Sequence, residues 1–199
     1  GVRYCRSDRV LEGIRAHAAV LPDQHRWIRL GRERYAGKRV LFVLPVQNAG
    51  GGGNVVVAKT RILRRMGVDA VLFNLAGNRE GFEAGHFQKD FPVLYGEVED
   101  LRHYAAGFDA VVATAYFSVN MIRDYVDPRP GLRIGYFVQD FEPYFFAEGT
   151  RHYRDALRSY TLIPDMVCFA NSEWTQRELI RQTGVDCRLA GPCFNMNDF

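Results

Sequence analysis

Short apolar runs alternate with amphipathic stretches along most of the chain. Six runs have the length and the valine-, isoleucine- and phenylalanine-rich composition of buried strands; they cover residues 40–46, 68–75, 108–114, 132–139, 166–170 and 187–190. Helices are predicted from residue 54 to 66 and over 118–125, 152–160 and 172–183, whereas residues 76–93 are loop-rich and 95–106 only weakly helical. Strands that alternate with helices predict an α/β, Rossmann-like parallel sheet with helices on both faces.

The first predicted strand leads into four consecutive glycines, residues 50–53. The helix that follows has Asn54 in position for an N-cap, Gly67 as its C-terminal stop, and an apolar face that consists of Val55, Ala58, Ile62 and Met66. The unpaired amides of a helix N-terminus attract anions, and glycine lets a phosphate or sugar hydroxyl approach the backbone. Because four glycines are costly to order, the pattern favours a ligand-facing loop over a turn that binds nothing.

This loop matches neither of the common nucleotide-binding motifs. No Gly-Lys-Ser/Thr sequence ends it, which excludes a P-loop, and the third glycine of a GxGxxG fingerprint counted from Gly50 would fall on Val55. The broken fingerprint argues against a nicotinamide-dependent enzyme, and we expect no cofactor.

Composition narrows the class of protein further. The 199 residues, 47% of them hydrophobic, suffice for one large domain or a domain with an extension. We find no apolar run of transmembrane length and no signal peptide in the first residues. A net charge of +3 without a basic block makes a nucleic-acid partner unexpected. The cysteines (Cys5, Cys168, Cys187 and Cys193) lack zinc-site spacing, so we expect no metal and reduced thiols in a cytoplasmic protein.

Residues 1–37 differ from the rest of the chain. A helical pattern over residues 8–21 is followed by a polar, arginine-rich stretch. We interpret residues 1–37 as a partly helical N-terminal extension and residues 38–190 as the Rossmann-like domain.

Ligands of parallel sheets bind at the carboxyl ends of the strands. Those ends fall at residues 47–53, 74–77, 114–118, 139–144 and 171–172, which are polar, glycine-rich or aromatic. Asp140 and Glu142 favour a binding role, because two acids beside a strand end are costly unless they are used. For Phe141, Phe145 and Phe146, sugar stacking and burial in the core are equally open. The candidate substrate-binding residues are Gly51, Gly52, Gly53, Asn54, Tyr116, Gln139, Asp140, Glu142 and Ser172.

Four elements together resemble the N-terminal domain of GT-B glycosyltransferases of family four: the glycine-rich loop, FDAVVATAYFS, YFVQDFEP and ANSEWTQRELI. YFVQDFEP is most similar to bacterial rhamnosyltransferase-like members that build surface polysaccharides, and the resemblance covers roughly residues 38–199. Many members have a histidine after the fourth strand, where this chain has Gln139 followed by Asp140. We therefore assign no catalytic residue.

The resemblance implies a two-domain enzyme that transfers a sugar, with retention of configuration, from a nucleotide-sugar donor to a glycan or lipid-linked acceptor. The N-terminal domain of that family binds the acceptor, and the donor is held mainly by a C-terminal domain that this chain lacks. Residues 191–199 are then the start of the interdomain linker, and the chain alone is expected to be inactive. The implied location is the cytoplasm, at the inner face of the membrane with peripheral contact to it.

Two other classes of function remain open. One is a GT-B nucleotide-sugar epimerase, and the other is a non-catalytic module that binds sugars or nucleotides.

Overall fold

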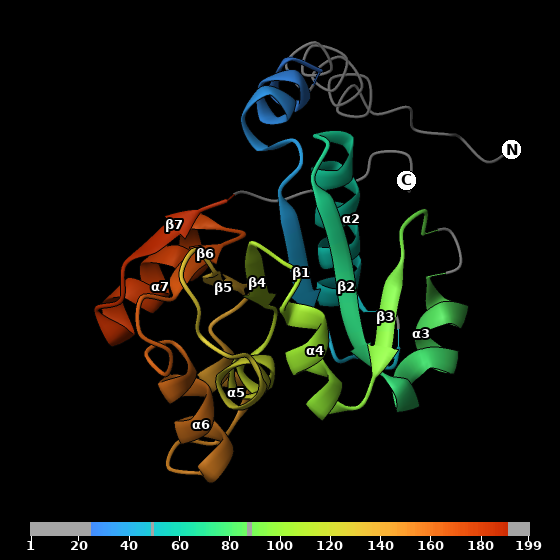
Figure 1. The fold of residues 1–199 in the computed structure, drawn as a ribbon. Coiled ribbons are helices and arrows are strands. Elements are labelled where there is room, and N and C mark those ends of the chain that lie inside the picture. The colour runs from blue at the N-terminus through green and yellow to red at the C-terminus, as the bar shows by residue number, and fades with distance from the viewer. Residues whose placement is uncertain (1–24, 49, 87–88, 191–199) are drawn as a thin grey trace, which may run out of the picture.

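In the part of the chain that the structure describes, a parallel sheet of seven strands forms the centre (Figure 1). The computed structural model describes residues 25–48, 50–86 and 89–190. In chain order the strands are β1 (Arg39–Val43), β2 (Asp69–Leu75), β3 (Val93–Gly96), β4 (Ala110–Ala113), β5 (Arg133–Val138), β6 (Val167–Ala170) and β7 (Cys187–Leu189). Their spatial order is β3-β2-β1-β4-β5-β6-β7. The predicted α/β, Rossmann-like fold class is confirmed.

Helices cover both faces of the sheet. They are α2 (Gly51–Arg65), α3 (Arg79–Gly85), α4 (Leu101–Ala105), α5 (Tyr116–Tyr125), α6 (Arg151–Ser159) and α7 (Glu173–Thr183), with 3₁₀ turns η1 (Ala76–Asn78), η2 (Val98–Asp100) and η3 (Glu142–Phe145). Alternate residues of β1 point to opposite faces, so Leu41 packs in one core and Phe42 in the other. The Leu41 core contains side chains of α4, α5 and α7, and the Phe42 core contains side chains of α2 and α3.

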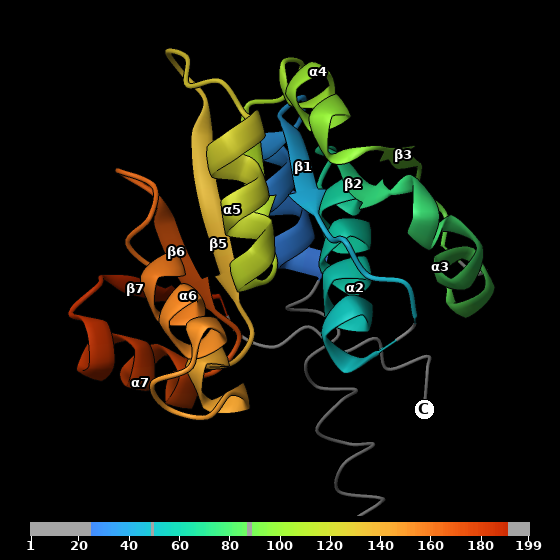
Figure 2. The ribbon, with the colours of Figure 1, turned by 90° about the horizontal axis from the view of Figure 1, so that it is seen from below.

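The strand order reverses between β1 and β4. The chain moves from β1 outward to β2 and β3, and then returns to β4 and continues outward to β7 on the other side. The loops that leave β1 and β4 therefore diverge, and such a switch point opens a crevice at the carboxyl ends of the strands. In Figure 1 these ends point downward, and Figure 2 looks onto them from below.

Two elements at the β3 edge of the sheet differ from the predictions. Residues 79–85 form α3 instead of a loop, and Val93–Gly96 is a strand where the sequence indicates loop followed by weak helix. The strand is only four residues long, and Val93, Leu94 and Tyr95 are half-buried, so it lacks the continuous apolar run of the central strands. Its pairing with β2 defines it as a strand, and that contact is not local in sequence.

Helix α2 begins earlier than predicted and buries a different face. Its N-cap is Gly50 rather than Asn54, so the last three glycines form its first turn. The buried residues are Gly53, Val56, Val57 and Thr60 instead of the face predicted from Val55 to Met66. Thr60 is tolerated in the core because its hydroxyl donates to the Val56 carbonyl at 2.9 Å. Gly67, in the left-handed conformation with φ +78°, follows the helix as predicted.

The described part of the N-terminal extension is helical over residues 25–35. Gly31 packs against Met66, since a Cβ at Gly31 would lie 2.5 Å from the Met66 sulfur. The Arg32 guanidinium donates to the Arg65 carbonyl at 2.9 Å and so caps the C-terminus of α2. This segment lies at the opposite end of the sheet from the crevice (Figure 1). The helix predicted over residues 8–21 lies outside the described residues.

The β6–β7 end of the sheet carries two buried thiols. Cys168 and Cys187 are free and lie opposite each other in the register of these strands. Across the described ranges, no helix has the length and apolar composition needed to span a membrane.

Candidate functional site

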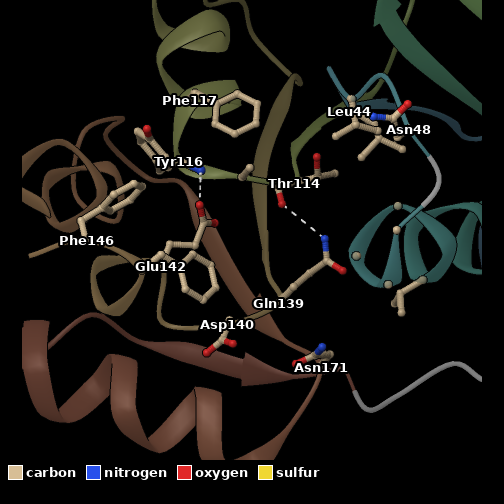
Figure 3. Close-up of a pocket in the computed structure, with 18 residues that line it drawn as sticks. Leu44, Asn48, Thr114, Tyr116, Phe117, Gln139, Asp140, Glu142, Phe146 and Asn171 are labelled. Carbon is tan, nitrogen blue, oxygen red and sulfur yellow. Dashed lines mark hydrogen bonds between the residues drawn. The ribbon is translucent and has the colours of Figure 1, made fainter. Parts of the chain in front are cut away.

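A cavity of about 640 Å³ opens at the switch point between β1 and β4 (Figure 3). The loops after β1, β4, β5 and β6 and the first turns of α2 and α5 form its walls. Its lining residues are Leu44, Val46, Asn48, Gly50, Gly51, Gly52, Gly53, Val55, Thr114, Ala115, Tyr116, Phe117, Gln139, Asp140, Glu142, Phe145, Phe146 and Asn171.

The first turn of α2 presents bare backbone to this cavity. The first helical hydrogen bond runs from the Asn54 amide to the Gly50 carbonyl at 2.9 Å. The amides of Gly51, Gly52 and Gly53 have no partner in the part of the chain that the structure describes, and no side chain caps the helix. A Cβ at Gly50 or Gly51 would meet no atom within 4 Å. The positive end of the 15-residue helix is therefore open to a ligand.

The loop between β1 and α2 is held by polar contacts beneath it. The buried Asn74 side chain donates to the Val46 carbonyl at 2.8 Å, and its own oxygen accepts from the Leu75 amide and the Asn78 side chain. Gly81 of α3 approaches the loop so closely that a Cβ there would lie 2.8 Å from the Gln47 carbonyl. These contacts fix the direction in which the chain enters α2.

The backbone that leads into α5 is hydrogen-bonded within the protein, in contrast to the start of α2. The Ser118 hydroxyl accepts from the Thr114 amide at 2.9 Å and from the Ala115 amide at 3.0 Å. The Tyr116 amide donates to Glu142 Oε2 at 3.0 Å (Figure 3). These three amides are thus already paired within the protein, whereas those of Gly51, Gly52 and Gly53 at the start of α2 have no partner among the described residues.

Glu142 lines the cavity, but both of its carboxylate oxygens are engaged. Besides the Tyr116 amide, it accepts a hydrogen bond from the Tyr136 hydroxyl at 2.5 Å, and its own amide donates to the Tyr160 oxygen at 3.1 Å. Burial raises the pKa of Glu142 above its usual value, the nearby Asp140 adds to the increase, and the bonds from Tyr116 and Tyr136 oppose it. Glu142 thereby ties η3 to the start of α5.

Gln139, Asp140 and Asn171 make fewer hydrogen bonds within the protein than Glu142 does. The Gln139 Nε2 donates a long hydrogen bond to the Thr114 carbonyl at 3.4 Å, and Asp140 Oδ1 accepts from the Phe141 amide at 2.7 Å. Gln139 Oε1 and Asn171 Oδ1 are buried, and neither has a hydrogen-bond partner among the described residues.

Four aromatic rings form a rim on the α5 and η3 side, made of Tyr116, Phe117, Phe145 and Phe146. Tyr116 meets Phe117 and Phe146 edge-on, with ring centroids 5.4 and 5.6 Å apart. Phe117 is 38% exposed and Phe145 is 63% exposed, which leaves ring faces free for a ligand. Burial raises the pKa of Tyr116, and the charges of Glu142 and Asp155 add to the effect.

Seven of the nine predicted site residues line the cavity. Asn54 and Ser172 are outside the lining set: Asn54 Oδ1 lies 3.0 Å from His86 Nε2, and Ser172 caps α7 by accepting from the Thr175 amide at 3.1 Å. For the phenylalanines left open between core and site, Phe141 is fully buried whereas Phe145 and Phe146 line the cavity.

Four polar or aromatic residues line the cavity without being among the predicted site residues: Asn48, Thr114, Phe117 and Asn171. All four lie in or beside the strand-end segments, so their position along the sheet is the signal that would have found them.

The charges of the cavity are unusual for a phosphate-rich ligand. No lysine or arginine occurs in the described lining, whereas Asp140 and Glu142 do. Within the described ranges, no group of three or more histidine, cysteine, aspartate or glutamate side chains is arranged to hold a metal ion. In the described lining, the attraction for an anion therefore comes from backbone amides and the dipole of α2, which suits one anionic group better than a nucleoside diphosphate.

No protein-family model matches the sequence, and no curated protein is similar to it. Among solved structures, the chain is similar to an alpha-glucosyltransferase in complex with UDP-glucose and DNA containing an abasic site, with a TM-score of 0.47 and 11% identity over 76% of this chain. The match covers 41% of that protein, so this chain spans less than half of its length. A second similar structure is an uncharacterized protein from Mycobacterium Paratuberculosis (TM-score 0.41, 13% identity, 75% of this chain and 74% of the other). At TM-scores below 0.5, neither likeness carries a functional argument.

Proposed function

We propose that this chain is the acceptor-binding domain of a retaining glycosyltransferase, which transfers a sugar from a nucleotide-sugar donor to a glycan or lipid-linked acceptor. The observation that supports this best is the composition of the switch-point cavity. It combines unpaired backbone amides, polar side chains at two strand ends and an aromatic rim, and its described lining has no basic side chain.

Each part of the cavity suits a sugar ligand. Carboxamides and carboxylates such as Gln139 and Asp140 bind hydroxyl groups, and exposed aromatic faces such as those of Phe117 and Phe145 stack on the apolar faces of sugar rings or contact a lipid. Gly51 to Gly53 approach one phosphate of the donor or an oxygen of the acceptor. Glu142 acts in this proposal as a positioning residue, because its oxygens are already bonded.

The lack of lysine and arginine in the described lining supports the proposal that this domain binds the acceptor rather than the nucleotide. A nucleoside diphosphate brings charge that proteins normally neutralise with basic side chains or a metal. In the proposed organisation, a second domain after residues 191–199 holds the donor, residues 38–190 hold the acceptor, and residues 1–37 are an extension. The proposed setting is the cytoplasmic face of a membrane.

Saturation-transfer NMR on the 199-residue chain tests whether it binds the acceptor or the nucleotide of the donor. We expect glycans and alkyl glycosides to receive saturation, with the alkyl and ring protons closest to the protein, and UDP alone to receive little. A chain that binds UDP in preference to every glycoside would contradict the acceptor-side assignment and favour a nucleotide-binding module.

Product analysis on a longer polypeptide that includes the following domain tests the reaction itself. Transfer with retained anomeric configuration supports the proposal. An epimerised nucleotide sugar, formed without consumption of acceptor, would replace it with the epimerase alternative.

A further inference from the structure

Two oxygen atoms of the cavity are buried without a hydrogen-bond partner in the described part of the chain: Gln139 Oε1 and Asn171 Oδ1. Proteins pair most of their buried polar atoms, because an unpaired acceptor loses its hydration and gains nothing in exchange. Two such atoms in one cavity indicate that the missing donors come from a ligand.

The two side chains are neighbours at the carboxyl ends of two adjacent strands, β5 and β6. Gln139 directly follows β5 and Asn171 directly follows β6, and the preceding residues, Val138 and Ala170, pair in register. The Asn171 amide also donates to the Val138 carbonyl at 3.4 Å. Adjacent strands are about 4.8 Å apart, so the carboxamides start about one strand spacing from each other.

The orientation of the Gln139 carboxamide follows from its surroundings. The Thr114 carbonyl, 3.4 Å from Nε2, can only accept a hydrogen bond, so the nitrogen faces Thr114 and Oε1 faces elsewhere. The whole carboxamide lies beside the first turn of α2, where a Cβ at Gly52 would be 3.3 Å from both Oε1 and Nε2. Figure 3 shows this carboxamide directed between Thr114 and α2.

We propose that Gln139 and Asn171 form a subsite that accepts hydrogen bonds from neighbouring hydroxyl groups of a sugar ring, and that this subsite selects a polyhydroxylated ligand. The inference rests on the proposed function and specifies which atoms distinguish the sugar. A carboxamide oxygen only accepts, so its partner must donate. A phosphate oxygen without a proton cannot donate, and Asp140 beside the subsite repels it.

Paired ligands separate recognition of hydroxyls from recognition of phosphate. Glucose, galactose and mannose 1-phosphates carry ring hydroxyls, whereas cyclohexyl phosphate has a six-membered ring and a phosphate but none. We expect at least one hexose 1-phosphate to bind the 199-residue chain more tightly than cyclohexyl phosphate does, by about fivefold for each hydrogen bond. Titration followed by ¹⁵N NMR measures each dissociation constant and locates the phosphate through the Gly51–Gly53 amides.

The variants Gln139→Met and Asn171→Leu remove the oxygens at nearly constant volume. We expect each to reduce the hexose preference about fivefold while leaving the affinity for cyclohexyl phosphate unchanged. Their melting temperatures should stay close to that of the wild type, because the lost oxygens have no partner in the described fold and Gln139→Met gives up only the long bond from Nε2 to the Thr114 carbonyl. Gln182→Met is the matched control, since Gln182 bonds Tyr144 on the exposed surface of α7 and is outside the lining set.

The possible results separate the subsite from the wider proposal. Phosphate binding without preference for any hexose, or a preference that survives both variants, overturns the subsite and leaves the acceptor-domain proposal standing. A fall in melting temperature without a change in preference shows that the carboxamides serve the fold, and also overturns it. If none of these ligands or any glycoside binds, the proposed function itself fails.

Discussion

At the scale of single residues, the site contains two kinds of polar side chain. Glu142 is saturated with hydrogen bonds from Tyr116 and Tyr136, whereas Gln139 has an oxygen with no partner in the described chain. The sequence predicts both as ligand contacts, because both follow the same buried strand. The sequence does not distinguish Glu142 from Gln139, because the partners of Glu142 are known only from the fold: Tyr136 lies in β5 and Tyr116 begins α5.

The raised pKa of Glu142 gives a prediction for stability. The folded protein binds this proton more tightly than the unfolded chain, so ionisation of Glu142 lowers the free energy of unfolding as the pH rises. The loss extends from the ordinary glutamate pKa up to the raised folded value. Glu142→Gln has no such charge, so its stability relative to wild type should increase across that window, by at most about 1.4 kcal/mol per pH unit, and then level off.

Urea denaturation of both proteins over a series of pH values measures this difference. Glu148→Gln, the same change at an exposed position on the loop before α6, is the matched control for replacing a carboxylate by an amide. A constant difference between wild type and Glu142→Gln at every pH would show that burial does not raise this pKa.

At the scale of elements, the contrast between the two helices at the switch point defines the site. Ser118 accepts from two amides just before α5 and Glu142 accepts from the first amide of that helix, whereas the amides of Gly51 to Gly53 stay unpaired within the described residues. Glycines in a first turn lower the stability of a helix, and the proposed binding of a ligand at their amides gives a reason for their presence.

Replacing Gly51 by alanine should separate the effect of this glycine on stability from its effect on binding. The added methyl group meets no atom within 4 Å, so the lower entropy of the unfolded chain should stabilise the protein by about 0.4–1 kcal/mol. The same methyl group enters the cavity and should weaken binding of hexose 1-phosphates severalfold. Gly77→Ala, also with open space around its Cβ but outside the lining set, should leave binding unchanged. Equal affinities of wild type and Gly51→Ala would remove this turn from the site.

Local chemistry explains which elements the sequence predicts well. Both ends of α7 are predicted well because the residues that set them are adjacent to the helix in the sequence. Ser172 caps its N-terminus, and Gly184 ends it in the left-handed conformation. The start of α2 is mispredicted because Asn54 has the chemistry of a cap, yet its side chain contacts His86, 32 residues away. β3 escapes prediction because its definition depends on pairing with β2.

At the scale of the whole molecule, the sheet combines a buried centre with short edges. Leu41, Val43 and Val111 of β1 and β4 are fully buried, whereas β7 has three residues and leaves Leu189 half-exposed. The sequence predicts the alternation of strands and helices, because local composition sets it. The sequence does not predict the switch point, because the order of the strands depends on the path that the chain takes after β3.

Hydrogen exchange should reveal this gradient. The amides of β1 and β4 should exchange slowest, at the rate of global unfolding, while those of β3 and β7 should exchange earlier through local opening of the edges. Peptide-resolved exchange followed by mass spectrometry provides the measurement. Equal protection of β7 and β1 would show that the sheet opens only as a unit.

The two buried thiols of β6 and β7 allow the opening of that edge to be followed by chemical modification. Burial raises the pKa of Cys168 to about 12 and that of Cys187 to about 11, so both stay protonated and unreactive while the strands are joined. Iodoacetamide should therefore modify them only when β7 separates from the sheet, and the two sites should be alkylated together. Their common rate would time the detachment of the last strand, and rapid, independent alkylation would show that the edge stands open.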